Sequence, residues 1–481
     1  MAVSPSRTPA RGRRSSVHRS IGGGRWRTSV EHCAPTPAAP AKNSHDRNNR
    51  GAAAHPGGAA GWGSSAAVGS SALPSLPTSA ENQAFFAAPD AATLAAAAPG
   101  DILRERDLTV TIAGVPTPVR MTQILYRTTD ALDRPSATVT SVLHPLNPSG
   151  EVLVYDSLYD TLNPEDNPSR FLTGTANVDD LIYTPEVMYA TPALLSGKTV
   201  VISDIQGPNA DFGAGPEYGA ATLDGLRAAR ASANTGVEPG QKTAIFGYSG
   251  GAIGSAWAAA MLDSYAPELR PDIVGVVEGG VLVNPERALT YAGNNPLWAG
   301  VVGMAITGLD RAYDLHLRDY LNATGQAMMD DLKDKGLLAA AGRYANLHWE
   351  DIAAPGYEDI RSVPRLGEVL DKINLVNAPA PSVPVLLTQG DAGFWELTPQ
   401  VNAANTTGDG VMTTADVHAL RDKYRAAGTP LTYREYGLLS HSVSTLATMG
   451  ESLGWLTDRF VGKPVPDSLP TPPAAAAAGS R

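Results

Sequence analysis

The stretch AIFGYSGGAIGSAWAAAM, residues 244–261, places Ser249 among glycines, after an apolar run and before an alanine-rich segment. Because the chain has 48 glycines in 481 residues, a Gly-x-Ser-x-Gly pentapeptide proves little by itself. A nucleophile elbow also requires a strand, a tight turn and a helix, since only small neighbours permit the strained serine. The sequence supplies all three, with a strand over 242–247 and a helix that ends before Pro267. We therefore predict that Ser249 is a nucleophile rather than an ordinary turn residue.

Around this stretch, runs typical of strands alternate with segments whose apolar residues have helical spacing. Further strands are expected within 107–128, 136–145, 150–160, 198–207, 272–280, 381–391 and 431–436. A helix is expected over 218–232, where Leu and Ala recur at helical spacing. Strands that alternate with helices indicate an α/β protein with a mostly parallel sheet covered by helices on both faces. Together with the elbow, this pattern predicts the α/β-hydrolase fold.

The composition is that of a soluble, fairly apolar globular protein. Hydrophobic residues make up 43% of the chain and charged residues 18%, below the usual value of about 25%. The formal net charge of -11 argues against a nucleic-acid partner, because phosphate contact requires a basic surface. Cys33 is the only cysteine, so no intrachain disulfide can form.

The two ends differ in composition from the body. Residues 1–80 are dominated by Arg, Gly, Ala, Ser and Pro, so we expect a disordered leader there and a loose tail over 466–481. Arg13 and Arg14 are of the kind found in twin-arginine export signals, but no continuous apolar run follows them. A start codon assigned too far upstream explains such a leader equally well.

His441 is the predicted catalytic base. It is the last of nine histidines and follows the expected strand 431–436, which fits the order serine, acid, histidine along an α/β-hydrolase chain. His316, His348 and His418 lie in stretches with helical patterning, where we expect structural roles.

Two aspartates are candidates for the acid that orients this base. Asp391 directly follows an expected strand, where the acid of this fold usually lies, and Asp409 lies on a turn that enters a helix. The second stretch also partly matches a calcium loop, with Asn405, Thr407 and Asp409 at ligand positions, but it has too few carboxylates and no bidentate glutamate. The residues alone leave both aspartates open and predict no metal site.

Several stretches between residues 85 and 460 carry a resemblance to a known family. They are FFAAPDAATLAAAAPGDILRER at 85–106, SDIQGPNADFGAG at 203–215, LDGLRAAR at 223–230, GYSGGA at 247–252 and DGVMTTADVHALRDKYRAAGTPLTYREYGLLSHS at 409–442. In these stretches the chain resembles the secretory lipase family, the lipase A type of fungi and actinobacteria.

The resemblance implies roles for residues of the site. It implies that the acid is the Asp of a D-x-V-[VP] turn, a position that Asp409 matches after an insertion, with Asp391 as the alternative. It implies an oxyanion hole formed by the backbone N–H groups of Gly250 and Asp204. The implied reaction is hydrolysis of lipid esters through an acyl-enzyme on the predicted serine, without a metal or a cofactor.

The resemblance also implies a helical cap over the site. Residues 281–380 are too many for a plain connection between two strands of the core, which is expected over 81–280 and 381–465. Within them, 294–309 is almost uncharged and 311–344 is amphipathic. The expected partner is a lipid or other ester substrate, met at a lipid–water interface, and no transmembrane segment is expected.

Other features limit what the resemblance implies. It implies a secreted or cell-envelope protein, but the family's cysteines are replaced here by Asp166 and Arg425, so the expected disulfides are missing. Other serine hydrolases and acyltransferases share the same catalytic constellation. A lipid-binding envelope protein without catalysis is the alternative from another class, because an acid displaced by the insertion before Asp409 would leave His441 unoriented. The oligomeric state stays open.

Overall fold

The structure, a computed structural model, describes residues 77–112, 115–174, 184–398 and 407–467. All of these lie in the compact unit Ser71–Arg481, and the chain's other unit, Met1–Ser70, is outside the described residues together with Cys33 and the predicted arginine pair. The first helix begins at Ser79, capped by the side chain of Thr78. Ser79 and Ala80, the last two residues of the predicted leader 1–80, therefore belong to a capped helix.

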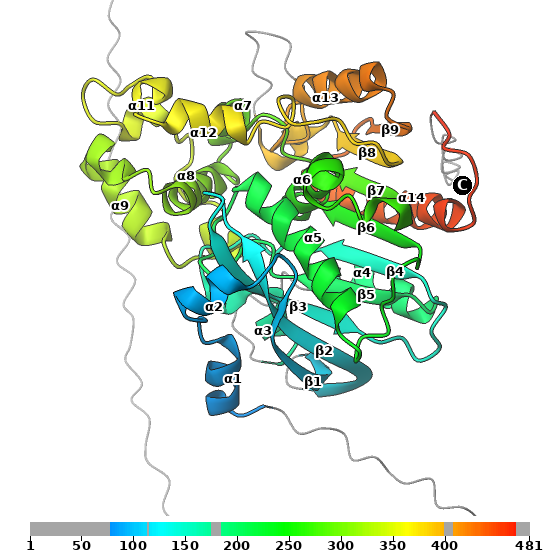
Figure 1. Cartoon of the computed structure of the whole chain (residues 1–481). Coiled ribbons are helices and arrows are strands. Elements are labelled where there is room, and N and C mark those ends of the chain that lie inside the picture. The colour runs from blue at the N-terminus through cyan, green and yellow to red at the C-terminus, as the bar shows by residue number, and fades with distance from the viewer. Residues whose placement is uncertain (1–76, 113–114, 175–183, 399–406, 468–481) are drawn as a thin grey trace, which may run out of the picture. The chain divides into compact units, whose positions relative to one another are not determined.

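The strands of the described residues form one nine-stranded sheet in the order β1-β2-β3-β5-β4-β6-β7-β8-β9 (Figure 1). They are β1 Ile102–Ile112, β2 Val115–Thr129, β3 Pro135–Leu143, β4 Val152–Asp156, β5 Thr199–Ser203, β6 Thr243–Tyr248, β7 Ile273–Gly279, β8 Val385–Gly390 and β9 Leu431–Tyr436. The pairs from β1 to β5 are antiparallel, and the pairs from β5 through β4 to β9 are parallel. The mostly parallel sheet confirms the predicted α/β-hydrolase fold.

The helices of the described residues, where η marks a short 3₁₀ helix, are α1 Ser79–Phe86, α2 Ala91–Ala96, η1 Pro164–Asp166, α3 Pro168–Phe171, α4 Thr184–Leu195, α5 Gly215–Ala231, α6 Gly250–Tyr265, η3 Arg270–Asp272, α7 Pro285–Gly293, α8 Ala299–Tyr313, η4 Leu317–Tyr320, α9 Ala323–Leu332, α10 Leu337–Ala340, α11 Trp349–Ile352, η5 Ile360–Ser362, α12 Leu366–Lys372, η6 Gly393–Glu396, α13 Thr414–Ala427 and α14 His441–Phe460. His418 lies in α13 as expected, whereas His316 and His348 lie just before η4 and α11.

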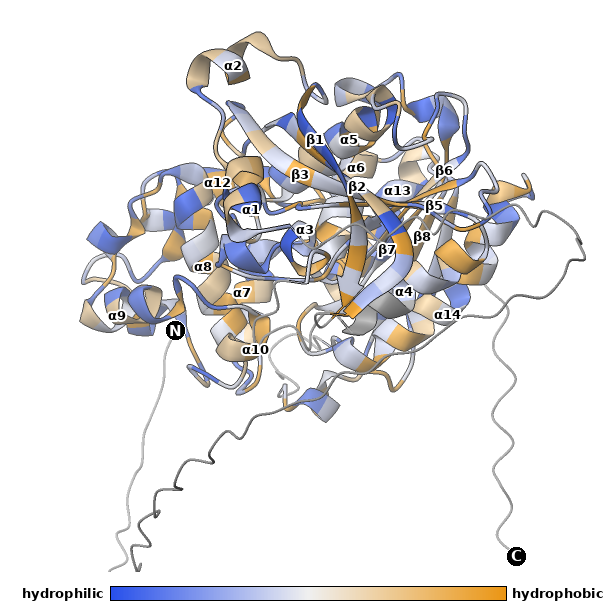
Figure 2. Ribbon diagram, turned by 90° about the horizontal axis from the view of Figure 1, so that it is seen from below, coloured by the Kyte–Doolittle hydropathy of each residue, from blue (hydrophilic) through white to orange (hydrophobic). Residues whose placement is uncertain are grey.

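Successive residues along the buried strands face opposite sides of the sheet, and helices pack against both sides. In β4, Val152 and Val154 belong to a core that includes residues of α5 and α6. Leu153 and Tyr155, between and beside them, belong to a core that includes residues of α4, α13 and α14. Figure 2 shows hydrophobic residues concentrated in the central strands. Helices therefore cover both faces, as the alternating pattern predicted.

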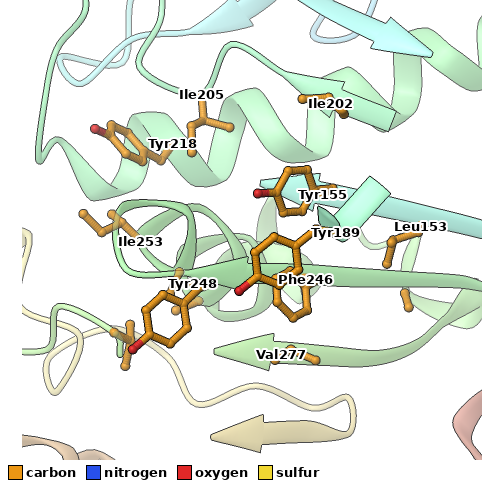
Figure 3. Close-up of a cluster of buried hydrophobic side chains, with 14 of the residues drawn as sticks. Leu153, Tyr155, Tyr189, Ile202, Ile205, Tyr218, Phe246, Tyr248, Ile253 and Val277 are labelled. Carbon is orange, nitrogen blue, oxygen red and sulfur yellow. The ribbon is translucent and has the colours of Figure 1, made fainter. Parts of the chain in front are cut away.

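An aromatic cluster supports the sheet close to the carboxyl ends of its strands (Figure 3). The rings of Tyr155 and Tyr189 stack with centroids 5.5 Å apart, and the ring of Tyr189 lies 4.8 Å from that of Phe246. The hydroxyl of Tyr189 also donates to the carbonyl oxygen of Thr445, at 3.1 Å. The cluster thus joins α4 to the first turns of α14, the helix that begins with His441.

The chain between β7 and β8 folds into the helices α7 to α12, with η4 and η5 among them (Figure 1). Their apolar side chains form a hydrophobic cluster of their own, in which Met304, Leu332 and Leu370 are buried. Leu162 and Phe212, from loops that follow β4 and β5, complete this cluster. Within the described residues, no helix has both the length and the apolar character needed to cross a membrane.

Candidate active site

The turn between β6 and α6 holds Ser249 in a strained backbone conformation, with φ 54° and ψ −120°. A non-glycine residue pays about 1–3 kcal/mol for such a conformation, which persists only where its surroundings impose it. A Cβ atom on Gly247 would lie 2.2 Å from the carbonyl oxygen of Gly251, and one on Gly251 would lie 2.1 Å from that of Asp156. Strand, helix and the end of β4 therefore approach more closely than side chains permit, which explains the glycines around Ser249.

Three side chains predicted from the sequence meet at this turn. The Oγ atom of Ser249 lies 2.7 Å from Nε2 of His441, and Nδ1 of the same imidazole lies 2.6 Å from Oδ2 of Asp409. His441 and Asp409 are 3% and 0% exposed, so the hydrogen bond between them is buried, whereas the bond between His441 and Ser249 is half-buried beside the cavities. Bonds of this kind are stronger in a buried environment than in solution. The geometry is that of a nucleophile, a base and an orienting acid.

The two candidate acids have different surroundings. Asp409 accepts the backbone N–H groups of Val411 and Met412 on Oδ1, at 2.9 and 2.8 Å, which directs its other oxygen to the imidazole. Asp391 instead accepts the backbone N–H of Leu438, at 2.7 Å, and orders the loop after β9. The structure therefore brings Asp409 to the base and gives Asp391 a different partner.

The insertion 391–408 does not displace the acid. The backbone N–H of Gly393 donates to the carbonyl oxygen of Gly408 at 2.8 Å, and Ala392 and Gly408 form a β-bridge. The chain thus returns to the point where it left, one residue before Asp409. The acid is therefore not displaced by the insertion, and Asp409 remains within hydrogen-bond distance of His441.

The environment of His441 favours its protonated form. Burial by itself would lower the pKa of its imidazole, but the nearby carboxylates of Asp409, Glu396 and Asp160 outweigh burial and raise the pKa above its ordinary value. The site is therefore suited to stabilise an imidazolium formed during a reaction.

Asp204 does not occupy the position that the family resemblance implied. Its backbone N–H donates to the carbonyl oxygen of Val139 at 2.8 Å. Its carboxyl accepts the N–H and the hydroxyl of Ser169, at 2.9 and 2.5 Å, and Asp204 lines neither cavity beside Ser249. The expectation of an oxyanion donor at Asp204 is therefore not supported, because its N–H is already engaged.

A different aspartate, missed in the sequence, lies beside Ser249. Asp160 follows β4 and lines both cavities that meet at Ser249. A Cβ on Gly250 would lie 1.7 Å from its Oδ1, so the Asp160 carboxyl rests against the backbone of Gly250. Burial raises the pKa of Asp160 to about 7, so near neutral pH much of this carboxyl keeps a proton that it can donate.

The N–H of Gly250 is a second donor at the same place, because the first N–H groups of a helix have no partner within it. The available signal for Asp160 was its position. It follows a buried strand that pairs with β6, at the carboxyl edge of a parallel sheet, where functional residues gather.

Two cavities meet at Ser249. The first lies against α7 and α8, and its wall is almost entirely apolar, including Leu289, Val301, Val302, Ala305 and Leu309. The second opens along α14 and is lined by Tyr189, His441, Thr445, Leu446 and Met449. Trp298 and Leu337 line both cavities and separate them near the nucleophile.

Within the described residues, no group of three or more His, Cys, Asp or Glu side chains is arranged to hold a metal ion. Of the residues that partly match a calcium loop, Asn405 lies outside the described residues. Asp409 has one oxygen on two backbone N–H groups and the other on the imidazole.

Solved structures with a similar fold include two ester-hydrolysing proteins. The X-ray structure of Candida antarctica lipase A in its closed state superimposes with a TM-score of 0.69 at 23% identity, and covers 82% of this chain and 89% of that chain. A ligand-bound form of the rice cell wall degrading esterase LipA from Xanthomonas oryzae gives a TM-score of 0.52 at 16% identity over 75% of this chain and 98% of that chain. At these identities the likeness shows the fold.

Sequence relatives point to one family. A probable inactive lipase of Mycobacterium tuberculosis is 33% identical over 382 residues, covering 77% of this chain and 80% of the relative. Lipase 4 of Candida albicans is 28% identical over 400 residues, covering 81% of this chain and 83% of the relative. Residues 173–468 match the family described as secretory lipase. The chain therefore belongs to the secretory lipase family.

Proposed function

We propose that this protein is a serine hydrolase that cleaves lipid esters through an acyl-enzyme. The observation that carries the proposal is the continuous chain of hydrogen bonds from Ser249 through His441 to Asp409, with distances of 2.7 and 2.6 Å. Family membership and the lipase relatives support hydrolysis of ester substrates. The buried environment supports a reaction in which charge develops at the imidazole.

In the proposed reaction, Oγ of Ser249 attacks the ester carbonyl carbon while Nε2 of His441 takes the hydroxyl proton. The tetrahedral intermediate collapses as the ester C–O bond breaks, and the imidazolium gives its proton to the departing alcohol. Water then attacks the acyl-enzyme with the same base, which releases the fatty acid and restores the serine. Asp409 holds the imidazole and stabilises its charged form throughout.

The oxyanion is proposed to receive two hydrogen bonds, one from the backbone N–H of Gly250 and one from the protonated carboxyl of Asp160. The close contact between these two residues supports this pairing, because any side chain at position 250 would collide with the carboxyl. Burial raises the pKa of Asp160 to about 7, which favours the protonated carboxyl that this pairing requires. A neutral carboxyl in an apolar site is an effective donor to a developing negative charge.

The helices α7 to α12 are proposed to form a cap whose apolar interior receives the acyl chain. Support comes from the first cavity, which starts at Ser249 and continues along the aliphatic side chains of α8. An acyl chain buried there gains about 0.8 kcal/mol per CH₂ group. The second cavity, next to His441, is proposed to hold the alcohol portion, since that portion must accept the proton from the imidazole.

A lipid surface is the proposed partner of an apolar rim around the second cavity. Its members are exposed side chains of the insertion, of the loop after β9 and of α14, namely Phe394, Trp395, Leu397, Leu438, Val443 and Leu446. Apolar residues recur along α14 in Figure 2. Leu446 belongs both to this rim and to the wall of the cavity. Exposed apolar patches of this kind mark interaction sites.

The rim is tested with Trp395→Ser and Leu397→Ser, and with Leu195→Ser, at an exposed leucine outside the rim, as control. Hydrolysis of a triacylglycerol emulsion is expected to fall about ten- to a hundredfold in the rim variants, since each loses roughly 1.5–3 kcal/mol of apolar contact with lipid. Hydrolysis of a dissolved short-chain ester is expected to stay unchanged. Equal effects on both substrates, or an effect of the control, would exclude a lipid-docking role.

The secretory lipase family also supports a secreted or cell-envelope location. Cell fractionation is expected to place the protein outside the cytoplasm. Recovery only from the cytoplasm would contradict this part of the proposal.

A lipid-binding protein without catalysis is the second candidate, because one relative is described as a probable inactive lipase. The full chain is to be assayed with p-nitrophenyl esters of short and long acyl chains and treated with a fluorophosphonate. Ser249→Ala is expected to lose about 10⁶-fold in kcat and all labelling, whereas Ser264→Ala, at an exposed serine of α6, is expected to keep both. A folded wild-type protein that neither hydrolyses esters nor takes the label would favour the binding protein.

A further inference from the structure

The insertion before Asp409 contributes a glutamate to the surroundings of the site. Glu396, at the end of η6, is 8% exposed. Its Oε2 accepts the indole N–H of Trp298 at 2.8 Å, and its Oε1 accepts the backbone N–H of Ser442 at 2.7 Å. Trp298 precedes α8, and Ser442 follows His441 in α14. One carboxylate therefore joins the helical segment 285–372 to the turn that carries the histidine.

Neighbouring bonds fasten the insertion to the helical segment again and to the turn that carries Asp409. The side-chain amide of Asn295, which is fully buried, donates to the carbonyl oxygen of Glu396 at 2.8 Å and to the hydroxyl of Thr398. The hydroxyl of Thr398 in turn donates to the carbonyl oxygen of Gly410 at 2.9 Å. The insertion thus contacts Ser442, which follows His441, and Gly410, which follows Asp409.

The indole of Trp298, which Glu396 holds, lies between the imidazole of His441 and the two cavities. The ring of Trp298 meets the imidazole of His441 edge-to-face, with centroids 5.8 Å apart and planes at 82°. Trp298 also lines both cavities where they meet at Ser249. Rotation of the indole would therefore change the packing of the base and the boundary between the two cavities together.

We propose that Glu396 is a positioning residue that couples Trp298 to the helix turn of His441, and that this coupling sets the selectivity of the site for acyl-chain length. The inference rests on the proposed esterase function and names what controls its substrate range. The carboxylate of Glu396 is engaged by Trp298 and by the backbone N–H of Ser442, so it acts through the groups that it holds.

The negative charge of Glu396 should also affect the pKa of His441, and therefore the pH profile of kcat/KM, which a merely structural residue would leave unchanged. The carboxyl groups facing His441 come from two loops, with Glu396 and Asp409 in the loop after β8 and Asp160 in the loop after β4. The aromatic rings of Tyr248 and Trp298, which also face His441, carry no charge. Removal of one negative charge lowers the pKa of the imidazole. Because the base must be neutral in the free enzyme, the acid limb of kcat/KM is expected to move to lower pH in Glu396→Gln.

The test uses two pairs of matched variants of the full chain. Glu396→Gln is paired with Glu451→Gln, at a carboxylate of α14 that binds Tyr436 and Arg434 instead. Trp298→Phe is paired with Trp349→Phe, whose indole donates to the carbonyl oxygen of Tyr357 away from Ser249. The measurements are kcat and KM for p-nitrophenyl butyrate and p-nitrophenyl palmitate as functions of pH, with thermal unfolding of every variant.

Glu396→Gln is expected to lose about tenfold in kcat/KM, because an amide oxygen can replace only one of the two accepted hydrogen bonds. Its acid limb is expected to move to lower pH. Trp298→Phe keeps the ring but loses the donor, and its ratio of palmitate to butyrate kcat/KM is expected to change about tenfold. Both control variants are expected to keep the wild-type pH profile and ratio.

Two further results separate this inference from the proposed function. If the wild type is active and Ser249→Ala is not, but the Glu396 and Trp298 variants behave like their controls, the inference is wrong and the esterase stands. The coupling is also measured without turnover, by NMR titration of the His441 ring in Ser249→Ala with and without Glu396→Gln. An unchanged titration midpoint in the double variant would overturn the coupling even for an inactive protein.

Discussion

Two loops at the carboxyl edge of the sheet each bring a buried aspartate to the site, and they give its carboxyl group different surroundings. The loop after β8 surrounds Asp409 with donors, since Val411 and Met412 each give it a backbone N–H and His441 lies at 2.6 Å. The loop after β4 buries Asp160 against Gly250, and burial raises its pKa to about 7. One aspartate is thus arranged to accept hydrogen bonds, and the other is the one we propose as a donor. The number of donors around a carboxyl, rather than its identity, decides which task it can perform.

The sharpest way to break this comparison is to neutralise the accepting aspartate. Asp409→Asn keeps the shape but presents an amide to the imidazole, which then has no acceptor for its Nδ1 proton. We expect kcat to fall by about 10⁴-fold, the cost of the equivalent change in the Ser-His-Asp template. Asp391→Asn, measured with the same p-nitrophenyl esters, is expected to stay near wild type, and a larger loss there than at Asp409 would reverse the assignment of the acid.

The next effect concerns removal of the donor on the other loop. Asp160→Ala is expected to lower kcat by about 10²–10³-fold, the usual cost of one oxyanion donor. Gly250→Ala is expected to do the same, because its Cβ would lie 1.7 Å from Oδ1 of Asp160. Gly450→Ala, in α14 with open space around the added methyl group, serves as the control and is expected to be harmless. Wild-type kcat in Asp160→Ala would show that this carboxyl is not an oxyanion donor.

Replacement by asparagine should lower kcat much less at Asp160, the proposed donor, than at Asp409, the acceptor. Asp160→Asn retains an N–H that can donate to the oxyanion, so we expect a loss of about tenfold or less at neutral pH. The informative quantity is the ratio of this loss to the loss in Asp409→Asn, with kcat measured on one ester and in one buffer. Similar losses in the two variants would mean that the two loops do not differ as described.

The smallest expected effect is on pH dependence. Activity that needs a protonated Asp160 should decline as pH rises through about 7, and Asp160→Asn should lack this decline. Stability follows the same sign. The folded-state pKa lies above the unfolded value of about 3.9, so between these values the folded state binds more protons and stability falls as pH rises. The Tm of Asp160→Asn relative to wild type is therefore expected to increase from pH 4 to pH 7, and a constant difference would contradict the raised pKa.

Much of the fold could be predicted because its signals are local. Alternating and apolar runs marked the strands, and the glycines around Ser249 marked a turn where strand and helix approach too closely for side chains. The order of motifs along the chain was sufficient to nominate His441. The choice of Asp409 over Asp391 came from family resemblance, since both follow the same strand and only hydrogen bonds in the folded chain distinguish them.

Residues that depend on contacts between distant loops could not be found in this way. The N–H of Asp204 is engaged by Val139 on a neighbouring strand, and no sequence pattern reveals that pairing. Asp160 gains its role from Gly250, 90 positions later, through a contact that only the missing side chain of glycine permits. Glu396 lies in what reads as an unremarkable insertion, and its two partners come from segments about a hundred and about fifty residues away.

The closure of that insertion at its base has a consequence for protein engineering. Because Gly393 bonds to Gly408 and η6 is held from both sides, the position of Asp409 is fixed independently of the length of chain between residues 399 and 406. Doubling the length of such a closed excursion costs only about 0.6 kcal/mol in chain entropy. A peptide tag or a recognition loop could therefore be grafted between Thr398 and Thr407 while Asp409 keeps its alignment with His441.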